Sequence, residues 1–179
     1  MKRSFFATCA CTALWTVGMA AGPARAAVLF DTLGADSSGY SIIAPGSQGG
    51  PLAASFSTGA TAASLTDVKL LLTTTNVTSG ESVSVALYDD NATSPGNLLQ
   101  TIGNIAESSL TNPFTVVDLP LGTPYALAAN ARYWIELAEP DGGAKWSWTS
   151  DQSGTGVSGE SYLFNGLRTC RSVPELNGR

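Results

Sequence analysis

The sequence predicts an all-β fold, arranged as a two-sheet antiparallel β-sandwich of jelly-roll type. Beyond residue 26 no stretch has the 3.6-residue periodicity of an amphipathic helix. Short runs rich in Val, Leu, Thr and aromatic residues alternate with clusters of Gly, Pro, Ser, Asn and Asp. Several of these runs alternate apolar and polar residues, so each strand has one face on a core and one nearer solvent. Two sheets packed face to face satisfy this pattern.

The strands expected from this pattern follow one another at short intervals. The run 82–87 places Val83, Val85 and Leu87 on one face and serines on the other. The run 132–137 places Tyr, Ile and Leu on one face and Arg, Trp and Glu on the other. In chain order, the expected strands are 28–33, 40–44, 53–57, 65–74, 82–88, 98–102, 114–119, 131–138, 145–150 and 161–164.

Turn chemistry separates these runs. Ser94-Pro95-Gly96-Asn97 offers a proline for the first turn position and a glycine for positive φ, and Glu139–Gly143 offers the same between two strands. Asp89-Asp90-Asn91 ends a strand. It is read as an Asx-type turn, because a calcium site needs six to eight converging oxygens and the spacing is not that of an EF-hand loop.

Residues 1–26 have the three-part pattern of a secretory signal peptide. Lys2 and Arg3 precede an uncharged apolar run, and Ala24 and Ala26 have the spacing that signal peptidase requires. We therefore expect cleavage after Ala26 and export to the periplasm, cell surface or extracellular matrix of a bacterium. No later segment is long and apolar enough for a helical span, so no stable membrane span is expected after cleavage. The expected organisation is a signal peptide at 1–26, one β-sandwich domain at 27–167 and a short tail at 168–179.

Charge argues against nucleic acid as a partner. Three of the nine bases precede the predicted cut and all fourteen acids follow it, so six bases and fourteen acids leave a net charge of −8. Phosphate binding needs clustered Lys and Arg, and the remaining bases are scattered. This acidic balance fits an extracytoplasmic protein.

Residue types also argue against catalysis. The chain has no histidine, which removes the commonest general base and most zinc sites, so no metal and no cofactor are expected. After cleavage Cys170 is the only cysteine, so no intramolecular disulfide can form. Neither the esterase elbow nor a P-loop occurs. The remaining catalytic possibility is glycoside hydrolysis by a pair of carboxylates. No sequence motif surrounds the acids available for it, which are Glu136, Glu139, Asp141 and Glu160. We therefore expect a chain that is not an enzyme.

Aromatic residues supply the one candidate binding site. Trp146 and Trp148 are two apart on an expected strand and therefore face the same side; Tyr162 and Phe164 repeat the spacing. Exposed coplanar rings stack on sugars, so Trp146, Trp148 and Tyr162 are the candidate carbohydrate-binding residues. The competing interpretation, which we favour, is that these rings fill the core, since each buries a large area.

The order of these features resembles a known family. Phe56-Ser57-Thr58-Gly59 leads into Leu65–Leu70, then come Val83–Asp90 and Ser94–Leu99, and Tyr133–Leu137 precedes a Trp-containing strand. In this order the chain resembles the choice-of-anchor R domain of exported bacterial proteins, over most of residues 27–167. The resemblance implies a β-sandwich and export. It implies no catalytic residues.

The end of the chain resembles part of a sorting signal. Proteins of this kind often end in Val-Pro-Glu-Pro, an apolar helix and arginines, the PEP-CTERM signal. Here Val173-Pro174-Glu175 matches the first three residues, but neither the second proline nor the helix follows. The resemblance implies a truncated tail and a released protein, and an ordinary chain terminus is the alternative.

Two functions are therefore expected from the sequence. The first is a non-catalytic domain of the cell surface or extracellular matrix, with a surface protein as a partner. The second is a carbohydrate-binding module that recognises extracellular polysaccharide through surface aromatics.

Overall fold

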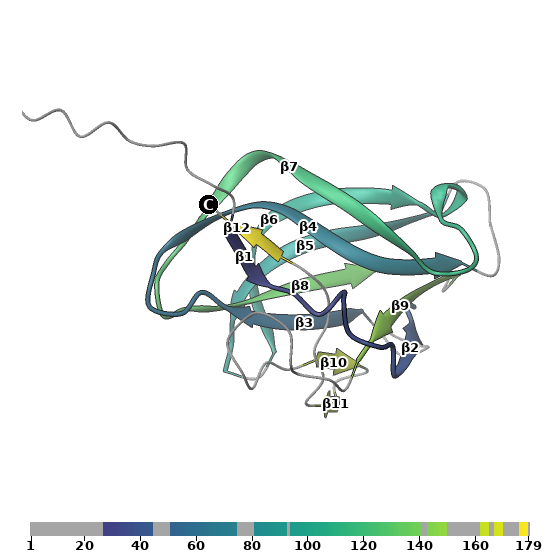
Figure 1. Ribbon diagram of the computed structural model, residues 1–179, viewed down its shortest axis with the longest axis horizontal. Helices are drawn as coiled ribbons and strands as arrows, with labels where there is room; N and C mark the ends of the chain where they lie inside the picture. Colours follow the sequence, from purple (N-terminus) through teal and green to yellow (C-terminus); the bar gives the residue numbers. More distant parts are fainter. Residues whose placement is uncertain are drawn as a thin grey trace, which may run out of the picture.

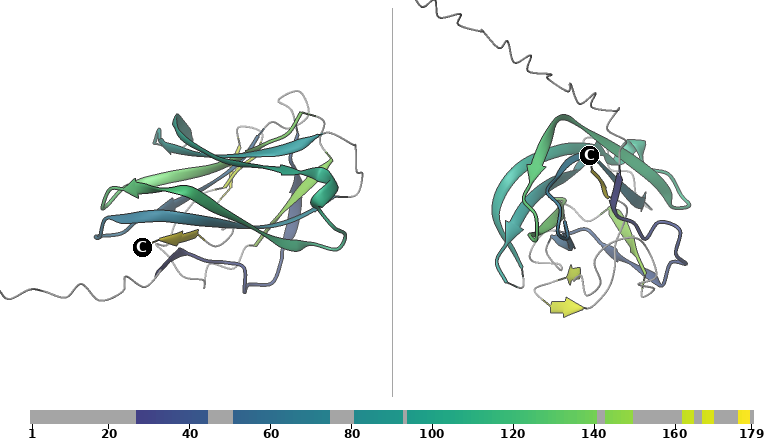
Figure 2. Two further views of the ribbon diagram at one scale, coloured as in Figure 1. Left: turned by 90° about the horizontal axis from the view of Figure 1, so that it is seen from above. Right: turned by 60° about the vertical axis from the view of Figure 1, so that its left-hand side comes forward.

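The computed structural model describes residues 27–44, 51–74, 81–92, 94–140 and 143–149, and the backbone of three short strands beyond them. Nearly every element is a strand, and the two sheets are drawn as two layers in Figures 1 and 2. In chain order the elements are β1 (Ala27–Phe30), β2 (Gly39–Ile42), β3 (Leu52–Ser57), β4 (Ala63–Thr74), β5 (Ser82–Asp90), β6 (Pro95–Ala106), the 3-10 helix η2 (Glu107–Ser109), β7 (Thr115–Leu127), β8 (Arg132–Ala138), β9 (Ala144–Trp148), β10 (Tyr162–Phe164), β11 (Leu167–Thr169) and β12 (Leu176–Gly178).

Two six-stranded antiparallel sheets form the sandwich. The β4 sheet runs β1-β12-β4-β9-β2, with β7 also paired to β4, and the β8 sheet runs β11-β10-β3-β8-β5-β6. Four antiparallel pairs are nested inside one another: β5 with β6, β4 with β7, β3 with β8, and β2 with β9. A long hairpin rolled up in this way is a jelly roll. The predicted all-β jelly-roll sandwich is therefore confirmed.

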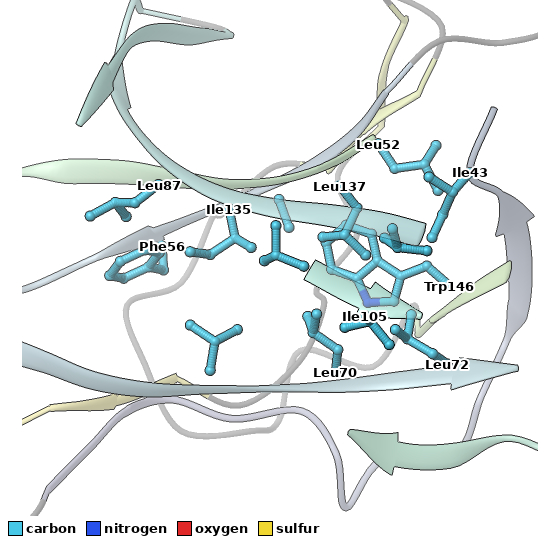
Figure 3. Packing of buried hydrophobic residues seen from close by; sticks show 14 of the residues in the cluster. Ile43, Leu52, Phe56, Leu70, Leu72, Leu87, Ile105, Ile135, Leu137 and Trp146 are labelled. Atoms are coloured by element: carbon cyan, nitrogen blue, oxygen red, sulfur yellow. The ribbon is translucent and has the colours of Figure 1, made fainter. Parts of the chain in front are cut away.

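The core lies between the sheets and follows the period-two pattern. Val83, Val85 and Leu87 of β5 are fully buried, as their alternation predicts. On β4 the buried positions change parity from Leu65 to Val68, because a β-bulge shifts the register of the β4–β7 pair between Leu65 and Asp67. Figure 3 shows buried apolar side chains of both sheets packed between the layers, among them Leu70, Leu87 and Leu137.

Two strands are longer than the sequence indicates. β7 continues from the predicted 114–119 to Leu127, across Pro120 and Pro124. Prolines are tolerated there because β7 lies at the edge of its sheet, where one row of N–H groups has no strand to pair with. β6, at the edge of the other sheet, likewise begins at Pro95 and ends at Ala106.

The turn predicted at Ser94–Asn97 lies three residues earlier. The Asn91 N–H donates to the Ser94 carbonyl (3.0 Å), and Ala92 has the positive φ of 58°. Gly96 belongs to β6, and a Cβ at this position would collide with the Asp89 carboxylate. Glycine is therefore needed at position 96 for space next to a side chain, and not for a left-handed backbone.

The end of the chain takes part in the β4 sheet. β12 lies within the tail predicted at 168–179, and it pairs with β1 on one side and β4 on the other. β11 straddles the predicted domain limit at residue 167 and pairs with β10. The predicted signal peptide at 1–26 lies outside the described residues.

Candidate functional site

The candidate sugar-binding tryptophans face the interior. Trp146 is 0% exposed and belongs to the hydrophobic core. Figure 3 shows its ring among Leu72, Ile105 and Leu137. Burial removes Trp146 from the candidate contact residues, because a ring without accessible surface cannot stack on a sugar. Trp148 is half-buried, and Tyr162 begins β10 but its side chain lies outside the described residues.

Trp148 is packed against its neighbouring strand. It pairs with Gly39 of β2, the edge strand of the sheet. A Cβ at Gly39 would lie 2.7 Å from the Trp148 ring, so the ring covers the space that a side chain on β2 would otherwise fill. This arrangement, in which an aromatic ring shields an edge glycine from across the strands, gives Trp148 a structural role.

A different set of side chains forms an exposed aromatic surface on the outer face of the β4 sheet. Tyr40 (52% exposed) and Ile42 (45%) alternate with inward positions on β2, and Val116 (52%) faces outward on β7. The Tyr40 and Phe114 rings meet with centroids 6.0 Å apart at 44°, and the Lys145 ammonium lies 4.7 Å from the Tyr40 centroid. We call these five residues the outer aromatic patch.

The register of the strands explains why the patch forms. Tyr40 pairs with Ser147, and Ile42 pairs with Lys145, so the residues on β9 between the aromatic side chains are a short serine and a flexible lysine. Small outward residues leave room above the sheet for the rings of β2 and β7 to approach one another. A cation placed over a tyrosine ring is attracted by the π-electrons, which holds the Lys145 ammonium at the patch.

The outer face of the β8 sheet holds a second group of polar and aromatic side chains. Trp134 is 0% exposed although it points away from the core, and its indole N–H donates to Asp90 Oδ1 (2.7 Å). The Tyr88 hydroxyl donates to Glu136. Burial raises the pKa of Glu136, while the hydrogen bond from Tyr88 acts in the opposite direction; burial and the Glu136 charge raise the pKa of Tyr88.

The Asp89–Asn91 turn uses its carboxylates within the protein. Asp89 accepts hydrogen bonds from the Asn97 side-chain amide (2.9 Å) and backbone N–H (2.5 Å). These bonds lower the pKa of Asp89, because they favour its charged form. With Asp90 bonded to Trp134, both acids stabilise the hairpin in the manner of turn-capping residues.

Among the described residues, the carboxylates available for glycoside hydrolysis do not converge. Glu136 lies on the outer face of β8, whereas Glu139 follows the strand and accepts a hydrogen bond from the Ala144 N–H (2.9 Å). Asp141 and Glu160 lie outside the described residues. No group of three or more His, Cys, Asp or Glu side chains comes together within the described ranges.

Sequence reasoning missed three features of the surface and interior. Tyr40 and Phe114 are 74 positions apart in the chain, and only the order β2-β9-β4-β7 brings them together. Glu107 and Glu139 are buried carboxylates, at 0% and 4% exposure. Polar side chains are rarely buried, so no sequence pattern marks them in advance.

Comparison with known proteins identifies no relative of this chain. No family model, no curated protein and no solved structure matches it. None of the helices in the described ranges has the length and apolar character needed to cross a bilayer.

Proposed function

We propose that this chain is a non-catalytic, exported binding domain of the bacterial cell surface or extracellular matrix. The outer aromatic patch is the observation that carries the proposal. The exposed Tyr40 ring and the half-buried Phe114 ring lie on the outer face of a sheet, where they can meet an extended partner. Large exposed apolar groups that cluster are typical of interaction surfaces, whereas scattered ones are ordinary.

Two further features support export. β1 begins at Ala27, the first residue after the predicted cut, so every strand that the structure describes lies in the chain that remains after cleavage. The acidic balance of the remaining chain suits a protein that stays soluble outside the cytoplasm. The resemblance to choice-of-anchor R domains belongs to the same proposal.

A second candidate function is recognition of extracellular polysaccharide by the outer aromatic patch. The exposed Tyr40 ring offers an apolar surface for the C–H face of a sugar. The neighbouring Lys145 ammonium offers hydrogen-bond donors to sugar hydroxyls and carboxylates. The patch therefore replaces the pair Trp146 and Trp148 as the site of this function.

Export is tested by determining the first residue of the protein that is recovered outside the cytoplasm. The full chain, expressed in a bacterial host, is collected from the periplasm and medium, and intact mass gives its first residue. We expect Ala27. Ala26→Tyr is the matched control, because signal peptidase needs a small residue there. Recovery of the wild-type chain only in the cytoplasm, beginning at Met1, would overturn the proposal.

Sugar recognition is tested by affinity electrophoresis of the exported protein in gels that contain acidic or neutral bacterial exopolysaccharides. We expect retardation in at least one of these polysaccharides, lost in Tyr40→Ala and weakened in Lys145→Met. Leu98→Ala is the matched control, since Leu98 is equally exposed (55%) but lies on β6 in the other sheet. Equal retardation of Tyr40→Ala and wild type would refute a role for the patch.

A further inference from the structure

Glu107 presents a buried carboxylate that has no hydrogen-bond partner among the described residues. It begins η2, directly after β6, where its N–H donates to the Glu81 carbonyl (3.2 Å) and its carbonyl accepts from the Leu110 N–H (2.9 Å). The side chain is 0% exposed, and neither carboxylate oxygen has a hydrogen-bond partner. Burying an isolated charged carboxylate is among the most costly arrangements in a folded protein, so a cation at this position would stabilise the fold.

The Glu107 carboxylate points at the segment that leads into β9. A Cβ at Gly143 would collide with its Oε1 and would lie 2.7 Å from its carboxyl carbon, so only a glycine leaves space for it. The adjacent residue, Ala144, donates its N–H to Glu139 Oε2 (2.9 Å). Two buried carboxylates, from η2 and from the end of β8, therefore approach consecutive residues of one short segment.

The surroundings of this segment are rich in oxygen. Thr74, the last residue of β4, donates its hydroxyl to the Gly143 carbonyl (3.2 Å). The Glu81 carbonyl lies beside the start of η2 through its bond to the Glu107 N–H. The ends of β4, β6 and β8 and the start of β9 thus bring carboxylate, hydroxyl and carbonyl oxygens to one end of the sandwich.

From this arrangement we infer that Glu107 and Glu139 hold a calcium ion that links η2 to the segment between β8 and β9. Calcium carries a double positive charge that offsets the buried Glu107 carboxylate, and it accepts six to eight oxygen ligands in irregular geometry. Magnesium suits the site less well, because it demands an octahedral shell and retains several waters. The remaining ligands are backbone carbonyls and water.

The ion closes one end of the sandwich. η2 connects β6 to β7, which belong to different sheets, and Glu139 leads from β8 to β9, which also belong to different sheets. A single ion bound to both the β6–β7 and the β8–β9 connections links the two sheets at that end. Extracellular modules bind calcium with a Kd of about 10⁻⁴ to 10⁻³ M, and we expect a Kd in this range here.

The test measures calcium binding and thermal unfolding of the exported full chain after removal of metals with a chelator. Isothermal titration calorimetry gives stoichiometry and affinity, and circular dichroism gives the Tm. We expect one calcium ion per chain, and a Tm that rises by roughly 5–10 °C when calcium is in hundredfold excess over its Kd. Magnesium at the same concentration is expected to raise the Tm much less.

Two variants locate the ion. Glu107→Gln and Glu139→Gln are each expected to weaken calcium binding at least about tenfold, since each removes a charged ligand. Without calcium, Glu107→Gln is expected to melt no lower than wild type, because it removes a buried charge that lacks a partner. Asp118→Asn on the exposed face of β7 is the matched control, and its calcium response should equal that of wild type.

Three results would overturn the inference. The first is no heat of binding and no change in Tm for wild type at calcium concentrations up to about 10 mM, well above the range of extracellular modules. The second is unchanged calcium affinity in Glu107→Gln or, if that variant does not fold, in Glu139→Gln. The third is an equal response to magnesium, which would remove the assignment to calcium.

Discussion

Truncation of Trp146 to alanine is expected to cost about 3–5 kcal/mol of the free energy of unfolding. The ring is 0% exposed. A tryptophan buries about 150–250 Å², worth roughly 4–6 kcal/mol at 25 cal/mol per Å². The alanine that remains and partial collapse of the cavity reduce this figure to the range found for large-to-small core substitutions. For a domain of this size, the Tm would fall by about 6–20 °C.

The assay is urea unfolding followed by far-ultraviolet circular dichroism, because the substitution itself changes the fluorescence. Tyr40→Ala is the control. Tyr40 is 52% exposed, so its truncation should cost no more than about 1 kcal/mol. If Trp146→Ala unfolds within about 1 kcal/mol of wild type at an unchanged slope with urea, the ring is not in the core and the reasoning fails. A loss of ligand binding in Trp146→Ala would accordingly report unfolding and not a lost contact.

Two further substitutions test local geometry. Gly39→Ala should destabilise the protein by about 1–3 kcal/mol, because the new Cβ displaces the Trp148 ring. A shift of the tryptophan emission should accompany this loss of stability. An unchanged Tm would show that the ring does not cover the glycine. Glu136→Gln should be more stable than wild type at neutral pH. Burial raises the pKa of Glu136 above its ordinary 4.5, so the native state binds a proton more readily than the unfolded state does. The free energy of unfolding of the wild type therefore falls as the pH rises through the interval between the unfolded and folded pKa values. Urea unfolding from about pH 4 to about pH 7 measures this, and parallel curves for variant and wild type would contradict it.

The layered fold could be predicted because period-two alternation reports directly which side chains share a face. The alternation in β5 predicts its buried valines, and the turn residues between runs separate the strands. Strand length was less predictable. Pro120 and Pro124 look like chain breakers, but on an edge strand the missing N–H groups cost little.

The candidate site was harder to predict, since alternation does not say which face meets the core. Trp146 and Trp148 do share a face, as their spacing requires, but that face is the inner one. The outer aromatic patch depends on strand order, which brings Tyr40 next to Phe114. In the sequence, Glu107 cannot be distinguished from a solvent-exposed glutamate, and only its position at the start of η2 places it in the interior.

The placement of β12 sets the order in which the chain can fold. Ala27 of β1 pairs with Gly178, and Figure 1 shows the C-terminus beside these two strands. Roughly 150 residues must be synthesised between the two halves of this ladder, and such distant pairings slow folding because the loop must close first. Until Leu176–Gly178 arrives, β1 lacks its neighbour and one edge of β4 is open beside it. During that interval the open edge presents unpaired backbone N–H and C=O groups, to which a strand of another chain could pair.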